Sequence, residues 1–398
     1  MSVASGRPRR LTAVLRDEER VTPLELFFDL VFVLALTQCT AHMAAVPSWE
    51  GVAQAMLILA LLWWAWGGYA WLTSVVNPEE GAVRIVMFVA MAAMLVAALC
   101  VPEAFDRLAL LFAVAYGIVR TAHIALFALA SRDDPQLRSS VIGLAGSTAV
   151  GVGLIAAAAA TDDVLQGALW AVALVLDFAG PYFFGAEGWR MLPEHFAERF
   201  GLIVIIALGE SIVAIGAGAE IGVDAGVVVA AVLGTAVAAA LWWLYFDVVA
   251  IAATRRLARA APGRERNSIG RDSYGYLHLP MIAGIVLGAL GLKKTLGDTD
   301  AALKLVPAAA MYGGTAMYLL AHVAFRLRNI HTLNRQRLVC ALLFLALIPV
   351  ATEISSLAAL GVVAGVLALL IAYEAIRFAD DRDRIRHELV REAEAETG

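Results

Sequence analysis

The sequence predicts an all-α membrane protein with about twelve transmembrane helices. Its 398 residues are 61% hydrophobic and only 16% charged, whereas a soluble domain is usually about 45–50% apolar and about 25% charged. The apolar residues gather in segments of about 20, the length that crosses roughly 30 Å of hydrocarbon as a helix. The basic residues concentrate in alternate connecting loops, as they do on the cytoplasmic side of membrane proteins.

Twelve apolar segments follow one another along the chain. The fifth is rich in glycine and alanine, and since small residues let helices approach closely in lipid, it too is expected to span. We place the twelve spans at 25–44, 52–76, 83–101, 108–130, 139–160, 164–184, 197–218, 226–252, 274–296, 303–325, 337–354 and 357–378.

The basic residues predict the orientation of the chain. With the N-terminus in the cytoplasm, 25 of the 30 Lys and Arg residues fall in the two tails and the inside loops, four fall in outside loops, and Arg120 lies within a span. Adding or removing one span would distribute the basic residues over both sides of the membrane. We therefore expect an even number of spans and two cytoplasmic tails, 1–24 and 379–398.

Four landmarks recur in the same order in the two halves of the chain. The matched stretches are ELFFDLVFVLALTQ (25–38) with ERFGLIVIIALGES (198–211), LLWWAW (61–66) with ALWWLY (240–245), TAHIALF (121–127) with LAHVAFR (320–326), and ALVLDFA (173–179) with LLIAYEA (369–375). The offset is six spans, which is even, so both halves have the same orientation. We predict two parallel six-helix repeats, 25–184 and 185–378, a plan known from transporters.

Glu210 is the deepest acid in the chain. It lies about twelve residues into the seventh span, between Gly209 and Ser211. A charge at the centre of a span costs roughly 2.5–3.5 kcal/mol by insertion measurements, so such groups usually face a bundle interior or water. We predict a carboxylate that binds a proton or a cation, with Ser211 beside it. The structural alternative is a protonated acid that hydrogen-bonds a neighbouring helix.

Glu25 and Asp29 begin a polar stripe along the first span. They are four residues apart and share one helix face. At 100° per residue, Thr40 returns to within about 20° of Asp29, and Thr37 lies about 80° away. We expect the stripe to face the bundle with the acids at its cytoplasmic mouth. For Glu25, capping of the helix N-terminus is an equal alternative.

Tyr116, Arg120 and His123 fall within about 60° of one another on the fourth span. A buried Arg needs a carboxylate partner. This face either anchors a substrate or locks the bundle through a structural ion pair. The candidate partners of Arg120 are Asp29, Asp177 and Glu210.

Polar groups nearer the span ends are expected to reach the membrane interface by snorkelling. They are His42, His322, Asp177, Asp247, Glu353 and Glu374. Asp177, His322 and Glu374, together with Glu198, are second-rank candidates for an ion path. Glu198 and Arg199 are expected to cap or anchor the seventh span, and the Trp pairs at 63–64 and 242–243 to serve in packing.

The sequence contains no motif for nucleotide binding, a zinc protease or a serine nucleophile. We predict no catalytic residue, metal, cofactor or nucleic-acid partner. Cys39, Cys100 and Cys340 lie far apart in apolar stretches, which is typical of small buried hydrophobic residues. The basic loop 254–271 can contact anionic lipid.

Two motifs carry a resemblance to a known family. PLELFFDLVFVLALTQ (23–38) and HFAERFGLIVIIALGESI (195–212) resemble the bacterial low temperature requirement A (LtrA) family, over essentially the whole chain. The resemblance implies a multi-pass protein of the bacterial plasma membrane, named for a growth phenotype in the cold. FFDLVFV is also similar to the first-helix signature of TMEM-type potassium channels, with Phe28 where a serine is expected, which hints at cation permeation.

These observations favour a secondary transporter or channel for a small ion or solute. It would use Asp29, Glu210 and Arg120 along a polar path between the repeats, with the lipid bilayer as its other partner. Two alternatives remain, a membrane-embedded lipid-handling enzyme and a non-transporting sensor or scaffold in cold or stress adaptation. An enzyme is the less favoured of these classes.

Overall fold

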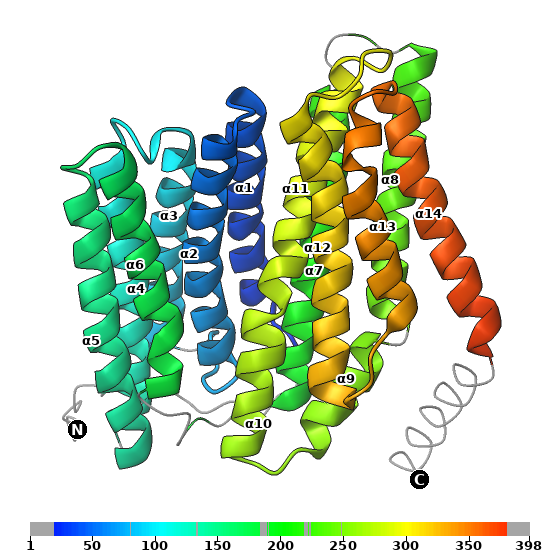
Figure 1. Cartoon of the computed structure of the whole chain (residues 1–398). Helices are drawn as coiled ribbons and strands as arrows, with labels where there is room; N and C mark the ends of the chain where they lie inside the picture. The colour runs from blue at the N-terminus through cyan, green and yellow to red at the C-terminus, as the bar shows by residue number, and fades with distance from the viewer. Residues whose placement is uncertain are drawn as a thin grey trace, which may run out of the picture. The chain divides into compact units, whose positions relative to one another are not determined.

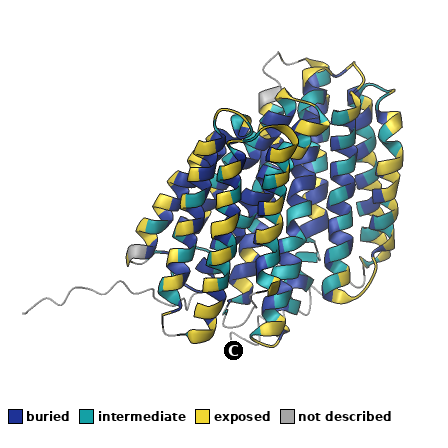
Figure 2. Ribbon diagram, turned by 60° about the vertical axis from the view of Figure 1, so that its left-hand side comes forward, coloured by how far each residue is buried: buried dark blue, intermediate teal, exposed yellow. Residues whose placement is uncertain are grey.

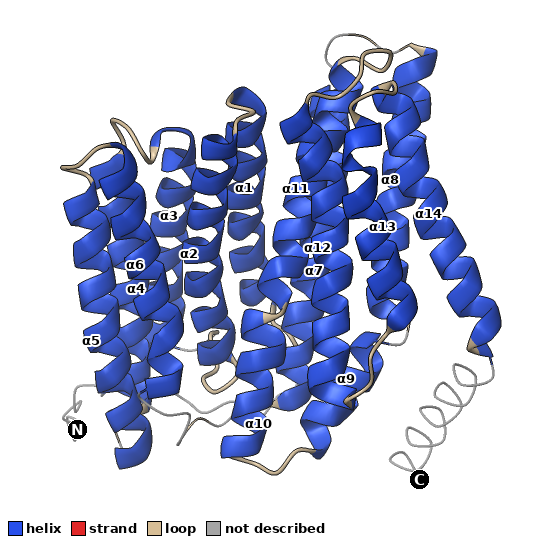
Figure 3. Cartoon of the chain, in the orientation of Figure 1, coloured by secondary structure: helices blue, strands red, loops and turns tan. Residues whose placement is uncertain are grey.

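Helices joined by loops make up the described residues, and no strand occurs among them (Figure 3). The computed structural model describes residues 20–79, 81–132, 134–183, 189, 191–218, 222, 224–247 and 249–379. The two predicted tails lie almost entirely outside these residues. Within them, the all-α fold class predicted from composition is confirmed.

Each of the twelve predicted spans coincides with one long helix. Figure 1 labels them α1 (Pro23–Ala45), α2 (Trp49–Thr73), α3 (Gly81–Cys100), α4 (Ala109–Ala130), α5 (Pro135–Ala158), α6 (Asp163–Phe183), α7 (Pro193–Gly218), α8 (Ala225–Phe246), α11 (His278–Gly297), α12 (Leu305–Ile330), α13 (Arg335–Ala351) and α14 (Ser356–Arg377). Eleven helical stretches of the described chain are long and apolar enough to cross a membrane. The exception among the twelve is α13, the shortest, with 17 residues.

Short polar side chains fix where several helices begin. Asp134 accepts from the backbone N–H groups of Gln136 and Leu137 at the start of α5, where Pro135 occupies the first helical position. Asp224 and Ser355 cap α8 and α14 in the same way. Each cap satisfies backbone donors that the first helical turn leaves without a partner.

The sides of the helices expose large apolar residues along their length. Val164 is 85% exposed, Ile376 81% and Leu369 73%. Figure 2 shows exposed residues throughout the helices and not only at their ends. A soluble protein rarely leaves so much apolar surface uncovered, so these sides suit a lipid bilayer.

The chain divides into two compact units. Unit 1 comprises 1–32, 61–196 and 262–267, and unit 2 comprises 33–60, 197–261 and 268–398. In unit 1, α3 packs on α4, α4 on α5 and α5 on α6. In unit 2, α11 packs on α12, α12 on α13 and α8 on α14. The repeat boundary at 184/185 stays a prediction.

The contact between α11 and α12 depends on glycine. A Cβ atom at Gly284 would lie 2.5 Å from the carbonyl oxygen of Gly314, and one at Gly314 would lie 2.6 Å from that of Gly284. The two backbones therefore meet directly, as small residues allow in lipid. Gly288, on the same helix, has open space at its Cβ position.

The connection between the eighth and ninth predicted spans, which includes the basic loop 254–271, is largely helical. It contains α9 (Val249–Arg259), α10 (Arg264–Ile269) and a π-helix, η3 (Gly270–Tyr276), which leads into α11. The arginines obscured an amphipathic pattern, because Ala253 and Leu257, four residues apart, are both buried.

Candidate functional site

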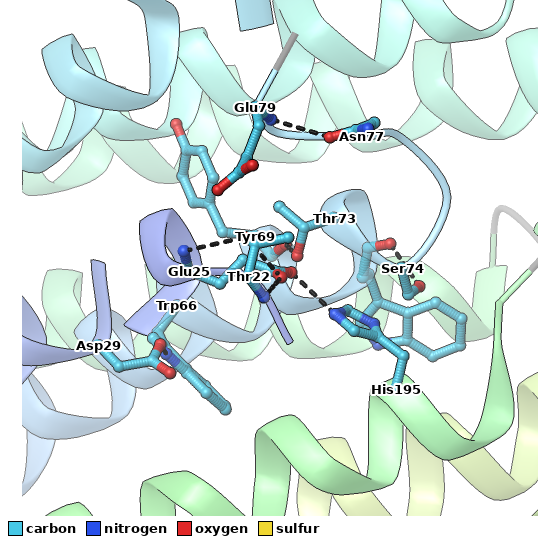
Figure 4. Close-up of polar contacts among 11 residues, drawn as sticks. Thr22, Glu25, Asp29, Trp66, Tyr69, Thr73, Ser74, Asn77, Glu79 and His195 are labelled. Carbon is cyan, nitrogen blue, oxygen red and sulfur yellow. Dashed lines mark hydrogen bonds and ion pairs between the residues drawn. The ribbon is translucent and has the colours of Figure 1, made fainter. Parts of the chain in front are cut away.

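Glu25 is held at the start of α1 by a capping box and by a histidine. Its carboxylate accepts from the backbone N–H of Thr22 at 2.8 Å, while the Thr22 hydroxyl accepts from the Glu25 N–H at 3.4 Å. The other carboxylate oxygen lies 2.9 Å from Nε2 of His195, the third residue of α7 (Figure 4). Both side chains are fully buried. Helix capping thus accounts for one oxygen of Glu25, and His195 is a partner that sequence reasoning missed.

Asp29 lies one turn further along α1 and is also fully buried. The indole Nε1 of Trp66 donates to its Oδ1 at 2.7 Å (Figure 4). The Trp66 ring packs against the rings of Phe32 and Trp63, with centroids 5.9 and 5.0 Å away. The Trp66 indole, held by its aromatic neighbours, therefore fixes this carboxylate. Trp66 is a second partner that sequence reasoning missed.

Arg120 pairs with Asp177, one of its three candidate partners. Its Nη2 lies 3.2 Å from Oδ1 of Asp177 and 2.8 Å from the Thr148 hydroxyl, and Tyr116 donates to Oδ2 of Asp177 at 3.0 Å. The ion pair is 1% and 2% exposed. Asp177 is therefore enclosed by α4, α5 and α6, and the expectation that it snorkels to the interface is wrong.

His123 lies one turn from Arg120 and packs against the backbone of α2. A Cβ atom at Gly68 would lie 2.8 Å from its Cε1 and 2.9 Å from its Nε2. The rings of Tyr69 and Phe127 flank the imidazole, with centroids 5.4 and 4.9 Å away. The position of His123 therefore depends on a glycine in α2.

Glu210 is 2% exposed, 17 residues after the first residue of α7 and eight before the last. The hydroxyl of Thr37 on α1 hydrogen-bonds its carboxylate, and that of Thr40 interacts with it as well. Lys293 acts on it only through the field of its charge. Within the described residues, no basic side chain forms an ion pair with Glu210. Ser211, beside it, is 8% exposed.

A further buried cluster occupies unit 2. Arg337 donates from Nε and Nη2 to Glu374, at 3.0 and 2.8 Å, and from Nη1 to Nδ1 of His322 at 3.0 Å. His322 is 1% exposed, so the expectation that it snorkels to the interface is wrong. Arg337 was missed because it lies at the start of a span and reads as a cytoplasmic loop charge.

The remaining candidates differ in how far they are buried. Glu198 is exposed, whereas its neighbour Arg199 is fully buried, which contradicts an anchoring role for the arginine at the membrane surface. Trp63 is 1% exposed, while Trp242 and Trp243 expose 43% and 39% of their surface. The described residues contain no group of three or more metal-ligating side chains.

Comparison with known proteins decides the family. A profile of the bacterial low temperature requirement A protein (LtrA) matches residues 20–372. The chain belongs to this family. An uncharacterized protein of Rhizobium meliloti (strain 1021) is 32% identical over 305 residues, which is 73% of each chain. No solved structure matches. The LtrA match spans both units and covers every residue of the clusters described above except Glu374.

Proposed function

We propose that this LtrA protein is a secondary transporter or channel for a small ion or solute, with Glu210 as its main binding group. One observation carries the proposal. Glu210 is a buried carboxyl group in an apolar helix, and its contacts within the described chain are hydroxyl groups, not a counter-charge. Buried ionisable groups in membrane helices usually mark ion or substrate pathways.

Two other acids in the helices have arginine partners. Asp177 is paired with Arg120, and Glu374 is paired with Arg337 in a two-point contact. Such pairs hold helices together, and we assign Arg120 to that structural role. Glu210, by contrast, presents carboxylate and hydroxyl oxygens, which are the ligands that hard cations and protons take.

The position of Glu210 supports the two-repeat plan that forms part of the proposal. Glu210 and Thr37 are equivalent positions in the matched stretches 25–38 and 198–211. Two parallel repeats related by a two-fold axis bring equivalent residues together only at that axis. The hydrogen bond between Thr37 and Glu210 agrees with this, and transporter sites typically lie where repeats meet.

A second similarity between the halves supports the same plan. In each unit an arginine–carboxylate pair lies beside a histidine from the matched stretches 121–127 and 320–326. We propose repeats 25–184 and 185–378 in the bacterial plasma membrane, with both termini cytoplasmic. Asp29, held by Trp66, is the second carboxylate of the proposed function.

The test is ion flux in liposomes. Purified protein is reconstituted, and potassium- and proton-driven fluorescence changes are followed for the wild type, Glu210→Gln and Asp29→Asn. Glu353→Gln is the matched control, because this acid is exposed and follows α13. Flux that Glu210→Gln abolishes and Glu353→Gln preserves is the expected result.

Two outcomes would contradict the proposal. Flux unchanged in Glu210→Gln would remove this carboxylate from the pathway. No flux from folded, oriented protein would instead favour a sensor, a scaffold or a lipid-handling enzyme.

A further inference from the structure

The cluster around His322 in unit 2 contains a hydrogen-bond donor with a fixed direction. Arg337 is the centre of this cluster. Its guanidinium binds Glu374 on α14 at two points, the carbonyl oxygen of Leu244 on α8 at 3.0 Å, and Nδ1 of His322 on α12 at 3.0 Å. Four helices of the unit therefore meet at one side chain.

The contact with Arg337 determines the tautomer of His322. A guanidinium can only donate, so Nδ1 of the imidazole must accept, and the ring proton of neutral His322 resides on Nε2. The side chain is 1% exposed, and Nε2 has no hydrogen-bond partner in the part of the chain that the structure describes. A buried N–H group without a partner is rare and indicates an acceptor that completes the site.

A second chain of hydrogen bonds lies close by, and its direction is fixed as well. Nδ1 of His278 donates to the carbonyl oxygen of Ser273 at 2.9 Å, because a carbonyl can only accept. Nε2 of His278 must then accept, and the Tyr245 hydroxyl donates to it at 2.8 Å. The phenolic oxygen of Tyr245 retains the capacity to accept a bond.

Contacts between aromatic rings connect these two series of hydrogen bonds. The Tyr245 ring stands edge-on to the imidazoles of His278 and His322, with centroids 5.6 and 5.8 Å away. The Tyr318 ring lies 4.6 Å from that of His322, and its hydroxyl donates to the carbonyl of Leu241. The Nε2–H donor of His322 and a phenolic oxygen that can still accept thus belong to neighbouring rings.

We propose that His322 binds the oxygen of an internal water molecule, which donates in turn to Tyr245. The charges of Arg337 and Glu374 cancel, so the cluster offers no net attraction for an anion, and the N–H group repels a cation. A neutral molecule that accepts one hydrogen bond and donates another fits both neighbours. Water is the smallest such ligand, and buried waters typically satisfy polar groups of this kind.

The bound water makes one continuous hydrogen-bonded chain. It runs from Glu374 through Arg337, His322, the water, Tyr245 and His278 to the carbonyl of Ser273. Ser273 lies in the π-helix η3, a distortion that occurs frequently at functional sites. The assignment does not depend on ion flux, so it can stand or fall separately from the proposed function.

The test is magnetisation transfer from water to histidine N–H groups. The chain has seven histidines, so protein labelled with [15N]histidine in lipid bilayers gives a tractable spectrum. His322→Gln assigns the resonance, and Tyr245→Phe removes the second partner of the water should the first variant fail to fold. Tyr312→Phe is the matched control, because it removes another buried hydroxyl in unit 2, one that donates to the carbonyl of Ala359.

The expected result is a neutral Nε2–H imidazole that receives magnetisation from water. The transfer should fall at least several-fold in Tyr245→Phe and stay unchanged in Tyr312→Phe. An N–H proton shifted upfield by an aromatic face, without transfer from water, would overturn the proposal. A hydrogen-bonded proton with transfer from lipid and none from water would also overturn it, because the acceptor would then be a lipid oxygen.

Discussion

Replacing Gly68 by alanine should reveal how tightly His123 is held against α2. The added Cβ atom would lie 2.8, 2.9 and 3.3 Å from Cε1, Nε2 and Nδ1 of the imidazole. Contacts below 3.0 Å require one partner to move. His123 has little freedom to do so, because Tyr69 and Phe127 flank it and it is 2% exposed.

Gly67 supplies a matched control in the neighbouring position. A Cβ atom there meets nothing within 4 Å. Alanine in place of glycine favours a helix by about 0.8–1.0 kcal/mol at either position, whereas overpacking costs about 1–3 kcal/mol. Gly67→Ala should therefore be neutral or stabilising, and Gly68→Ala should be less stable than Gly67→Ala by about 1–3 kcal/mol.

Reversible unfolding in mixed detergent–lipid micelles measures this difference. His123→Ala in the Gly68→Ala background should restore at least about 1 kcal/mol relative to additivity, because it removes the clashing ring. Equal stability of the two alanine variants would refute the reasoning, and so would strictly additive effects of Gly68→Ala and His123→Ala.

Three further predictions use the same unfolding assay. Asp177→Asn should lower the free energy of unfolding by about 3–5 kcal/mol, since it leaves a buried arginine without its counter-charge; a loss below 1 kcal/mol would contradict a buried ion pair. Gly284→Ala should be about 1–3 kcal/mol less stable than Gly288→Ala, because only the Cβ atom at position 284 would clash with the backbone of α12. Trp66→Phe should lose about 1.5–3 kcal/mol, the value of a hydrogen bond to a charged group, and an unchanged stability would show that Asp29 does not depend on the indole.

The helices were predictable because a bilayer imposes a simple length and composition rule. Twelve apolar segments predict twelve helices, including the glycine- and alanine-rich α5, whose start is fixed by the Asp134–Pro135 pair. The rule failed between 249 and 276, where arginines alternate with buried residues and suggest a loop. It also cannot show whether a short helix such as α13 crosses the membrane.

The partners of the polar residues were harder to predict, because they depend on which helices pack together. Helical periodicity placed Tyr116 and Arg120 on one face, but only packing brings Asp177, and not Asp29 or Glu210, to that face. His195 lies in a motif that was recognised, yet nothing in the sequence indicates that it contacts Glu25. Arg337 was counted as a loop charge because burial cannot be read from position near a span end.

The bond between His195 and Glu25 has a consequence for the order of events during synthesis. The two residues are 170 positions apart, and chains grow at about 5–20 residues per second, so Glu25 emerges roughly 9–34 s before its partner. Throughout this interval Thr22, three residues away, is already present to bind the carboxylate. The local capping box thus gives the first helix a satisfied acid during insertion, long before α7 exists to complete the pair.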